Sequence, residues 1–341
     1  MIIIPVLWMA LILYGIGVNR NGRRPLELNQ STVLRGICAV EIMMGHFGLM
    51  SGDTILYPNR KAGILFVGVF FMLSGYGTAY GVEHKEDYLR HFVLKKVWRL
   101  MFPAYLAFLL GMSVFGLFTG AGWQENGWAS LFHVKQFIQN TNWYVWEQLA
   151  LYVVFWVVYR VMPRRTNEVM TVLSVIYIGI AFLIRMDNPW YGSTLCFVLG
   201  LYYYRFEERA ARLIADHFRM LFAGCVVVLG LSMFIFFAWS NVSIAGVMVI
   251  HNPVARNMAS MSFCAIVIML LSKYEVGNKI SAFLGRCSYE IFLIHPSIMA
   301  ALLNVFDSHL VYAVVSMGVS VAAAVVLHWI CGKIFKLTGN M

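Results

Sequence analysis

Long apolar segments recur along the whole chain, and they restrict the fold more than any other feature of the sequence. Of its residues, 60% are hydrophobic and only 12% are charged, against about 25% charged in ordinary soluble domains. Apolar stretches close to the length of a bilayer-crossing helix predict an all-α polytopic membrane protein. Eleven such segments occur, at 2–18, 33–50, 62–82, 98–119, 142–162, 168–184, 190–205, 219–239, 257–272, 286–304 and 310–331.

The basic residues fall almost entirely in alternate connections between these segments. Of the 26 Lys and Arg residues, 21 belong to one set of connections or to a helix start beside it. The remaining five are Arg60, Lys61, Lys135, Arg185 and Arg256. Because positively charged connections of membrane proteins stay in the cytoplasm, we expect the N-terminus outside and the C-terminus in the cytoplasm. The net charge of +10 then reflects orientation in the lipid bilayer, and we expect no nucleic-acid partner.

These patterns predict about 10–11 transmembrane helices in two parts. Residues 1–32 would form an extra N-terminal transmembrane helix and a basic cytoplasmic turn. Residues 33–341 would form a membrane domain without a separate soluble domain. The connection 83–99 mixes aromatic and basic residues at helical spacing, which predicts an amphipathic helix at the membrane surface. The six cysteines show no pairing pattern, so we expect neither disulfides nor a metal site.

Two ionisable residues interrupt the apolar segment 33–50. Arg35 and His46 are separated by eleven positions, so on a helix both side chains lie on one face, about 16 Å apart along the axis. Ionisable groups inside a membrane helix usually face a protein interior or a wet cavity and mark a functional site. The pair suits a long anionic substrate whose phosphates bind Arg35 and whose reactive end reaches His46. Taken alone, the spacing also fits a snorkelling arginine and a hydrogen-bonded interior histidine.

Five short blocks, in order along the chain, resemble the type-3 membrane acyltransferase family. The first is the Arg-x10-His pair within 34–46. The others are similar to the family's FF-x-x-SG-aromatic, R-x-x-R-I-x-P-x-Y, W-[FY]-x-x-x-E and S-Y-x-I-Y-L-x-H segments, and lie at 70–76, 95–105, 142–147 and 288–296. The resemblance extends from Leu34 to about Cys331, nearly the whole chain.

The chain departs from the family pattern in three places. Lys96 stands where the family has the first arginine of R-x-x-R, which keeps the charge but loses a bidentate guanidinium. Glu41 occupies a position that is usually apolar, and we expect it to pair with another helix. The segment 2–18 precedes the family's usual first helix.

The resemblance implies transfer of an acyl group, most often acetyl from acetyl-CoA, to a hydroxyl of a carbohydrate or related envelope molecule. It implies a multi-pass protein of the bacterial plasma membrane, with acyl-CoA as donor cosubstrate, no tightly bound cofactor, and a carbohydrate or glycolipid acceptor. Arg35, Lys96 and Arg99 belong to the cytoplasmic end, where their cations would bind the phosphates of coenzyme A. Ser74 is expected to line the donor path.

His46 is the predicted general base, because an imidazole titrates near neutrality and can take the proton from an attacking hydroxyl. A covalent acyl-imidazole relay remains open. Glu147 lies at a similar depth and would either orient the imidazole or bind acceptor hydroxyls. Further candidates for the acceptor site or cavity are Trp143, Tyr76 and His295. Trp143 could instead be an interfacial anchor, and His295 could instead have a structural role.

Two alternative functions remain open at this point. Intramembrane Arg, Glu and His also mark the pathways of transporters, although no internal repeat of the kind that many transporters show occurs here. The second alternative is a relative that transfers succinyl or another acyl group.

Overall fold

The computed structural model describes residues 2–19, 24–52, 57–119, 137–138, 142–238, 243–244, 247–248 and 251–338. Within those ranges the chain forms twelve α-helices, two short 3-10 helices (η2, Pro163–Arg165, and η3, Asn188–Tyr191) and four strands of two residues each. The prediction of an all-α protein is confirmed.

Each of the eleven predicted apolar segments corresponds to one α-helix, although the helices often extend beyond the apolar stretch. The helices are α1 (Ile3–Tyr14), α2 (Leu28–Ser51), α3 (Tyr57–His84), α4 (Phe92–Thr119), α7 (Trp143–Val161), α8 (Thr166–Leu183), α9 (Leu195–Arg205), α10 (Glu207–Ala238), α11 (His251–Lys273), α13 (Ser288–Leu302) and α14 (His309–Leu337). A further helix, α12 (Lys279–Arg286), was not predicted.

By length and composition, seven helices of the described chain can cross a membrane: α2, α3, α4, α8, α10, α11 and α14. Helix α1 has 12 residues, or about 18 Å, and is shorter than the hydrocarbon core of about 30 Å. Helices α9 and α13 are also short, with 11 and 15 residues. These three helices therefore cross only part of a bilayer by themselves.

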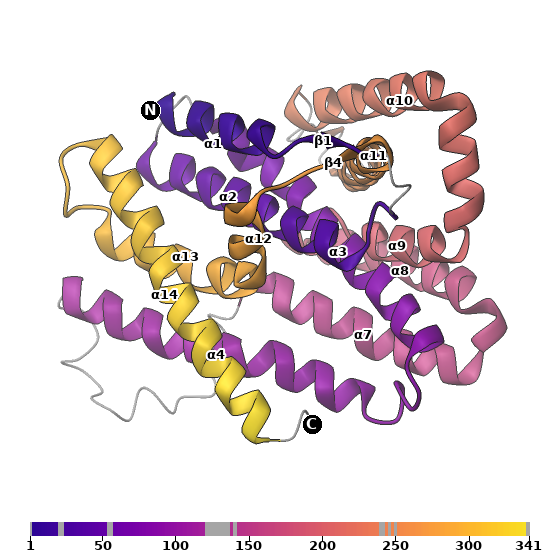
Figure 1. The fold of residues 1–341 in the computed structure, drawn as a ribbon, viewed down its shortest axis with the longest axis horizontal. Helices are drawn as coiled ribbons and strands as arrows, with labels where there is room; N and C mark the ends of the chain where they lie inside the picture. The colour runs from indigo at the N-terminus through magenta and orange to yellow at the C-terminus, as the bar shows by residue number, and fades with distance from the viewer. Residues whose placement is uncertain are drawn as a thin grey trace.

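Helix α2 lies at the centre of the arrangement and packs against α3, α12 and α13 (Figure 1). Helix α3 continues the packing toward α9 and α11, and α11 packs against α10. On the other side α13 packs against α4 and α14, and α4 packs against α7. The helix with the predicted Arg35 and His46 is thus in contact with both halves of the bundle.

Two pairs of glycines allow helices to approach closely. A Cβ atom at Gly75 of α3 would collide with the backbone of Phe197 in α9, and one at Gly200 of α9 would collide with the backbone of Met72 in α3. In the same way, Gly36 of α2 and Gly285 of α12 each leave room for the other helix's backbone. Small residues at such crossings are typical of packing between membrane helices.

The N-terminal helix is attached to the bundle through polar contacts. Trp8 Nε1 donates a hydrogen bond to Glu41 Oε1 of α2 at 3.2 Å, which confirms that Glu41 pairs with another helix. The amide of Asn278 donates to the carbonyl of Leu11 at 2.7 Å. Strand β1 (Gly17–Val18) then pairs antiparallel with β4 (Tyr274–Glu275), and β2 (Ser243–Ile244) pairs with β3 (Val247–Met248).

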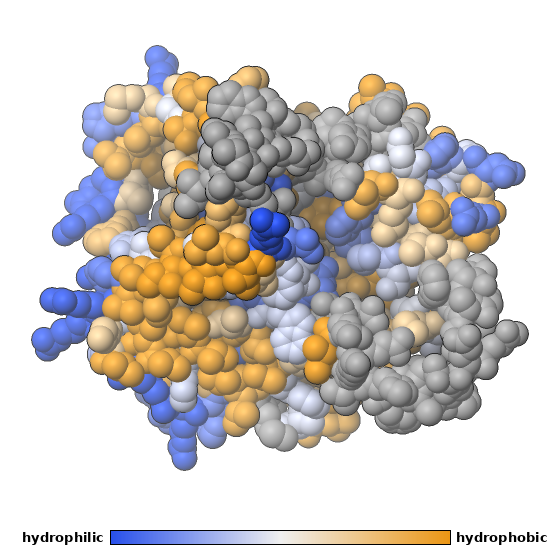
Figure 2. All heavy atoms as spheres, turned by 180° about the vertical axis from the view of Figure 1, so that it is seen from behind, coloured by the Kyte–Doolittle hydropathy of each residue, from blue (hydrophilic) through white to orange (hydrophobic). Residues whose placement is uncertain are grey.

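Large apolar side chains cover much of the outer surface (Figure 2). Examples are Val175 and Ile176 of α8, Val227 and Leu231 of α10, and Val326 of α14, all exposed. Soluble proteins rarely expose contiguous apolar areas of this size. The surface therefore fits a lipid environment, in agreement with the prediction of a polytopic membrane protein.

The connection between α3 and α4 differs from its prediction. The proposed surface helix over 83–99 is wrong, because residues 85–91 form turns and α4 begins at Phe92. Lys95, Lys96 and Arg99 consequently belong to the first turns of α4 itself. Helix α10 bends at His217 (Figure 1).

Candidate active site

A cavity of about 1300 Å³ opens at the end of the bundle where Arg35, Lys96 and Arg99 lie, called the basic end below. Its walls come from α2, α3, α4, α7, the turns between α3 and α4, and the α12–α13 junction. Eight lining residues are Lys or Arg and four are Asp or Glu, so the cavity attracts anions. Its volume exceeds the roughly 300–1000 Å³ of most small-molecule pockets, which suits a large ligand.

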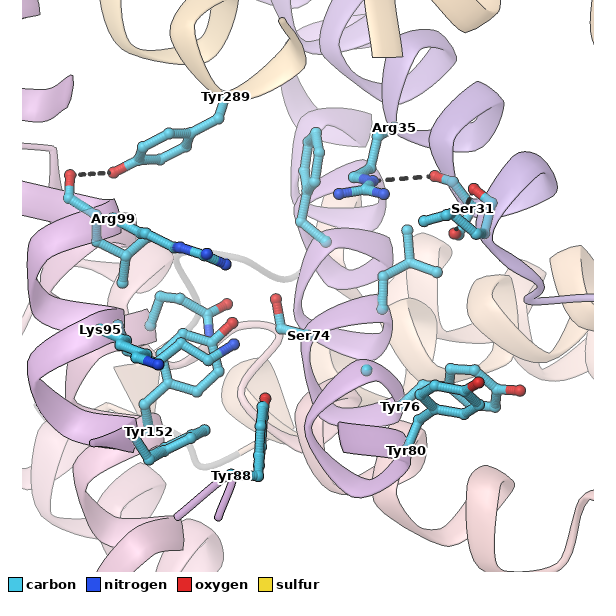
Figure 3. Close-up of a pocket in the computed structure, with 18 of the residues that line it drawn as sticks. Ser31, Arg35, Ser74, Tyr76, Tyr80, Tyr88, Lys95, Arg99, Tyr152 and Tyr289 are labelled. Atoms are coloured by element: carbon cyan, nitrogen blue, oxygen red, sulfur yellow. Dashed lines mark hydrogen bonds between the residues drawn. The ribbon is translucent and has the colours of Figure 1, made fainter. Parts of the chain in front are cut away.

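The three predicted donor-binding cations all line this cavity, on opposite walls. Arg35 extends from α2 and Arg99 from α4 toward the same space, with Ser74 between the walls (Figure 3). Arg35 is held in place by its Nε, which donates to the carbonyl of Ser31 at 3.1 Å. Lys96 Nζ lies 4.2 Å from the centre of the Tyr152 ring, a cation–π contact. The packing of α2 and α4 around the cavity thus brings Arg35 near residues that lie more than 60 positions later in the sequence.

Tyr76 also lines the cavity, at its edge. Its hydroxyl donates to Glu207 Oε1 at 3.0 Å, and Arg24 Nη1 lies 3.5 Å from the other oxygen of that carboxylate. The Glu207 carboxylate raises the pKa of Arg24 and offsets its charge. Among the four cations Arg24, Arg35, Lys96 and Arg99, Arg24 is therefore the one whose charge is balanced by a carboxylate of the described residues.

Three aromatic rings form the inner end of the cavity. Phe70, Tyr144 and Phe292 line it from α3, α7 and α13, with ring centres 5.0 Å apart for Tyr144 and Phe292 and 6.4 Å apart for Phe70 and Phe292. Phe292 also lies 6.3 Å from the ring of His295. These three rings are called the aromatic layer below; Phe292 links the cavity lining to His295, and neither His46 nor His295 lines the cavity.

Beyond the aromatic layer, the structure joins His46 of α2 to His295 of α13. His46 Nδ1 and His295 Nε2 are 2.6 Å apart, with the rings stacked at 19°. His295 is fully buried, whereas His46 is half-buried and keeps part of its surface accessible. Pro296 follows within α13 and lacks the N–H that would bond the carbonyl of Phe292.

The hydrogen bonds of this pair define the tautomer of each ring. His295 Nδ1 lies 2.8 Å from the carbonyl of Ile291. A carbonyl only accepts, so this Nδ1 carries the hydrogen and Nε2 of the neutral ring is an acceptor. His46 Nδ1 then donates to it, and His46 Nε2 keeps its lone pair. His46 is thus held in the form that can accept a proton.

Neither Glu147 nor Trp143 has a described contact with the histidine pair. Glu147 is 3% exposed and its Oε1 accepts a hydrogen bond from Thr194 Oγ1 at 2.6 Å. The ring nitrogen contact of His46 is made by His295, not by Glu147. Trp143 is half-buried and packs 6.5 Å from Phe71 and 6.3 Å from Tyr144.

The residues that escaped the sequence analysis include Gln148, Lys95 and Phe292, all of which line the cavity. Lys95 and Phe292 fall inside blocks that resembled the family, and Gln148 directly follows the block 142–147. Position within or beside a block was thus the available signal. In the part of the chain that the structure describes, no three His, Cys, Asp or Glu side chains gather to hold a metal ion.

The fold is that of a polytopic membrane protein. Its site combines a cationic cavity with an imidazole pair, and α2 and α13 contribute to both. The chain belongs to acyltransferase family 3, because the family model described as an acyltransferase domain matches residues 28–329. It is therefore a membrane acyltransferase, and the resemblance of the five blocks is confirmed. The comparisons with curated proteins and with solved structures found no match.

Proposed function

We propose that this membrane acyltransferase moves an acetyl group from acetyl-CoA, bound at the basic end, to a hydroxyl of a cell-envelope carbohydrate or glycolipid. We place the protein in the plasma membrane of a bacterium, with the basic end in the cytoplasm. Membership of the acyltransferase family favours this reaction over plain transport.

The basic cavity supports the assignment of the donor. Coenzyme A carries phosphates, and charge-assisted hydrogen bonds from Arg35, Lys96 and Arg99 suit such groups. Arg35 and Arg99 face one another across a cavity large enough for a nucleotide (Figure 3), and Lys96 also lines it. The acyl end would then extend past Ser74 toward the aromatic layer, over the roughly 16 Å that separates Arg35 from His46 along α2.

The histidine pair supports general-base catalysis. His46 Nε2 takes the proton of the acceptor hydroxyl as its oxygen attacks the thioester carbonyl carbon. The carbon–sulfur bond then breaks, and the leaving thiolate takes the proton from the His46 imidazolium. His295 Nε2 accepts from His46 Nδ1 throughout and stabilises the cation that forms. A relay in which His46 Nε2 first carries the acyl group uses the same nitrogen and the same partner.

Glu147 is proposed to act on the acceptor side. Its carboxylate is buried, and one oxygen, Oε2, has no hydrogen-bond partner among the described residues. A buried carboxylate oxygen of this kind is costly unless it is satisfied, and acceptor hydroxyls are suitable donors. We therefore assign the orienting role to His295 and acceptor binding to Glu147.

The single observation that carries the proposal is the hydrogen bond between His46 and His295 of α13. His46 lies on α2, the helix that also carries Arg35. The test uses purified protein in proteoliposomes with radiolabelled acetyl-CoA, and compares envelope glycans of cells with and without the protein. We expect base-labile acetyl groups that depend on the protein. Identical glycans, together with no transfer to any extracted envelope fraction, would contradict the proposal; succinyl-CoA and propionyl-CoA in parallel identify the acyl group.

A further inference from the structure

A buried amide at the inner end of the basic cavity has an unused hydrogen-bond donor. Gln148 of α7 is 1% exposed and lines the cavity. Its Oε1 lies 3.4 Å from the hydroxyl of Tyr144, which donates to it. Its Nε2 is buried and has no hydrogen-bond partner within the described part of the chain.

A buried N–H group without an acceptor lowers the stability of a protein. Most buried side-chain polar atoms in proteins are paired. An orphan donor that also lines a ligand-sized cavity is therefore expected to pair with an acceptor on the ligand. Ser74 lines the same cavity.

The surroundings of Gln148 indicate the chemistry of that acceptor. The cationic side chains of Arg35 and Arg99 extend from the cavity walls (Figure 3). Their charge is complementary to that of phosphate groups. The rings of Phe70, Tyr144 and Phe292 line the same cavity, and apolar rings do not replace the hydration of a charged ligand group. A neutral amide N–H among aromatic rings matches a neutral carbonyl oxygen.

We propose that Gln148 Nε2 donates a hydrogen bond to a carbonyl oxygen of the acyl-pantetheine arm of the donor, at the thioester or at the amide next to it. This inference rests on the proposed function, because it assigns a ligand contact within the donor site. Gln148 lies one helical turn from Tyr144, whose ring contacts Phe292, and Phe292 contacts the ring of His295. The amide therefore holds the arm between the cations and the histidine pair.

The proposal divides the donor site into two parts that respond to different donors. Arg35, Lys96 and Arg99 bind the nucleotide, whereas Gln148 binds the arm. A truncated thioester, S-acetyl-N-acetylcysteamine, has the thioester and one amide but no phosphates. Removal of the Gln148 N–H must weaken the binding of both acyl donors. Removal of a cation must weaken the binding of acetyl-CoA only.

The experiment measures KM and kcat/KM of the full-length protein in proteoliposomes with both donors. Gln148→Met keeps the size of the side chain and removes the N–H groups, and Gln148→Glu is a second variant of the same size. Arg99→Gln is the matched control. We expect Gln148→Met to raise KM about tenfold for acetyl-CoA and to lower kcat/KM about tenfold for the truncated donor. Arg99→Gln is expected to affect acetyl-CoA alone.

The outcomes separate this inference from the proposed function. If both Gln148 variants keep normal parameters for both donors while Arg99→Gln raises the KM of acetyl-CoA, the role of Gln148 is wrong and the donor assignment stands. A change confined to acetyl-CoA, or to the acceptor KM, also overturns it. If the unaltered protein transfers acetyl from neither donor, the proposed function itself fails.

Discussion

The basic cavity and the histidine pair differ in nearly every physical property, although Arg35 and His46 stand on one helix. The cavity is wide, carries an excess of cations and is lined by exposed Arg99. The histidine pair is joined by one short hydrogen bond, and Phe292 of the aromatic layer lies 6.3 Å from the ring of His295. Binding of a charged nucleotide tolerates water, whereas a reactive thioester must be kept from it. Under the proposed function, recognition of the donor and chemistry would occupy separate places along α2.

The largest expected effect is that of His46→Ala. Removal of the general base should lower kcat by about 10²- to 10⁴-fold, with the donor KM unchanged because the cavity lies beyond the aromatic layer. The measurement is acetyl transfer in proteoliposomes at saturating donor. A variant that folds normally and keeps full kcat would break the distinction between the two regions.

A smaller loss is expected for His295→Ala. This change leaves the Nδ1–H of His46 without its acceptor, and an unsatisfied buried donor costs about 1–3 kcal/mol, equivalent to about a ten- to hundredfold loss in kcat. His295→Gln supplies an oxygen acceptor and should retain more activity than His295→Ala. Equal activities of the two variants would show that His295 has only a packing role.

Next in size is the effect of Glu147→Gln on the acceptor. We expect the acceptor KM to rise about tenfold, since the carboxylate is replaced at the proposed hydroxyl-binding position, while the donor KM stays the same. Initial rates at varied acceptor concentration check this. A large fall in kcat at an unchanged acceptor KM would instead assign Glu147 to the chemical step.

The smallest effect is expected for Phe292→Leu, which thins the aromatic layer without emptying it. Water should reach the thioester more often, so hydrolysis of acetyl-CoA in the absence of acceptor should rise a few-fold relative to transfer. Phe71→Leu is the control, since Phe71 packs 5.0 Å from Tyr144 but does not line the cavity. Equal hydrolysis by the two variants would show that the layer does not protect the thioester.

Much of this arrangement could be predicted from the sequence, because its signals are local. The apolar segments located the helices, and the spacing of Arg35 and His46 placed both on one face of α2. The pairing of His46 with His295 could not be predicted in the same way, since it joins positions 249 residues apart across two helices. Gln148 and the aromatic layer likewise depend on how α3, α7 and α13 pack, and a single sequence carries no record of that packing. The prediction of a surface helix over 83–99 was wrong because α3 continues to His84 and α4 already begins at Phe92.

The most direct test of the central claim is the binding of coenzyme A to purified protein with single changes in each region. Titration calorimetry would compare Arg35→Gln, His46→Gln and, as a charge-matched control outside the cavity lining, Arg160→Gln. Arg35→Gln is expected to raise the Kd about tenfold or more, because a charge-assisted hydrogen bond is worth about 1.5–3 kcal/mol. His46→Gln and Arg160→Gln should bind as the unaltered protein does. An unchanged Kd for Arg35→Gln, or a large loss of binding in His46→Gln, would contradict the division of the site into a donor-binding cavity and a separate catalytic pair.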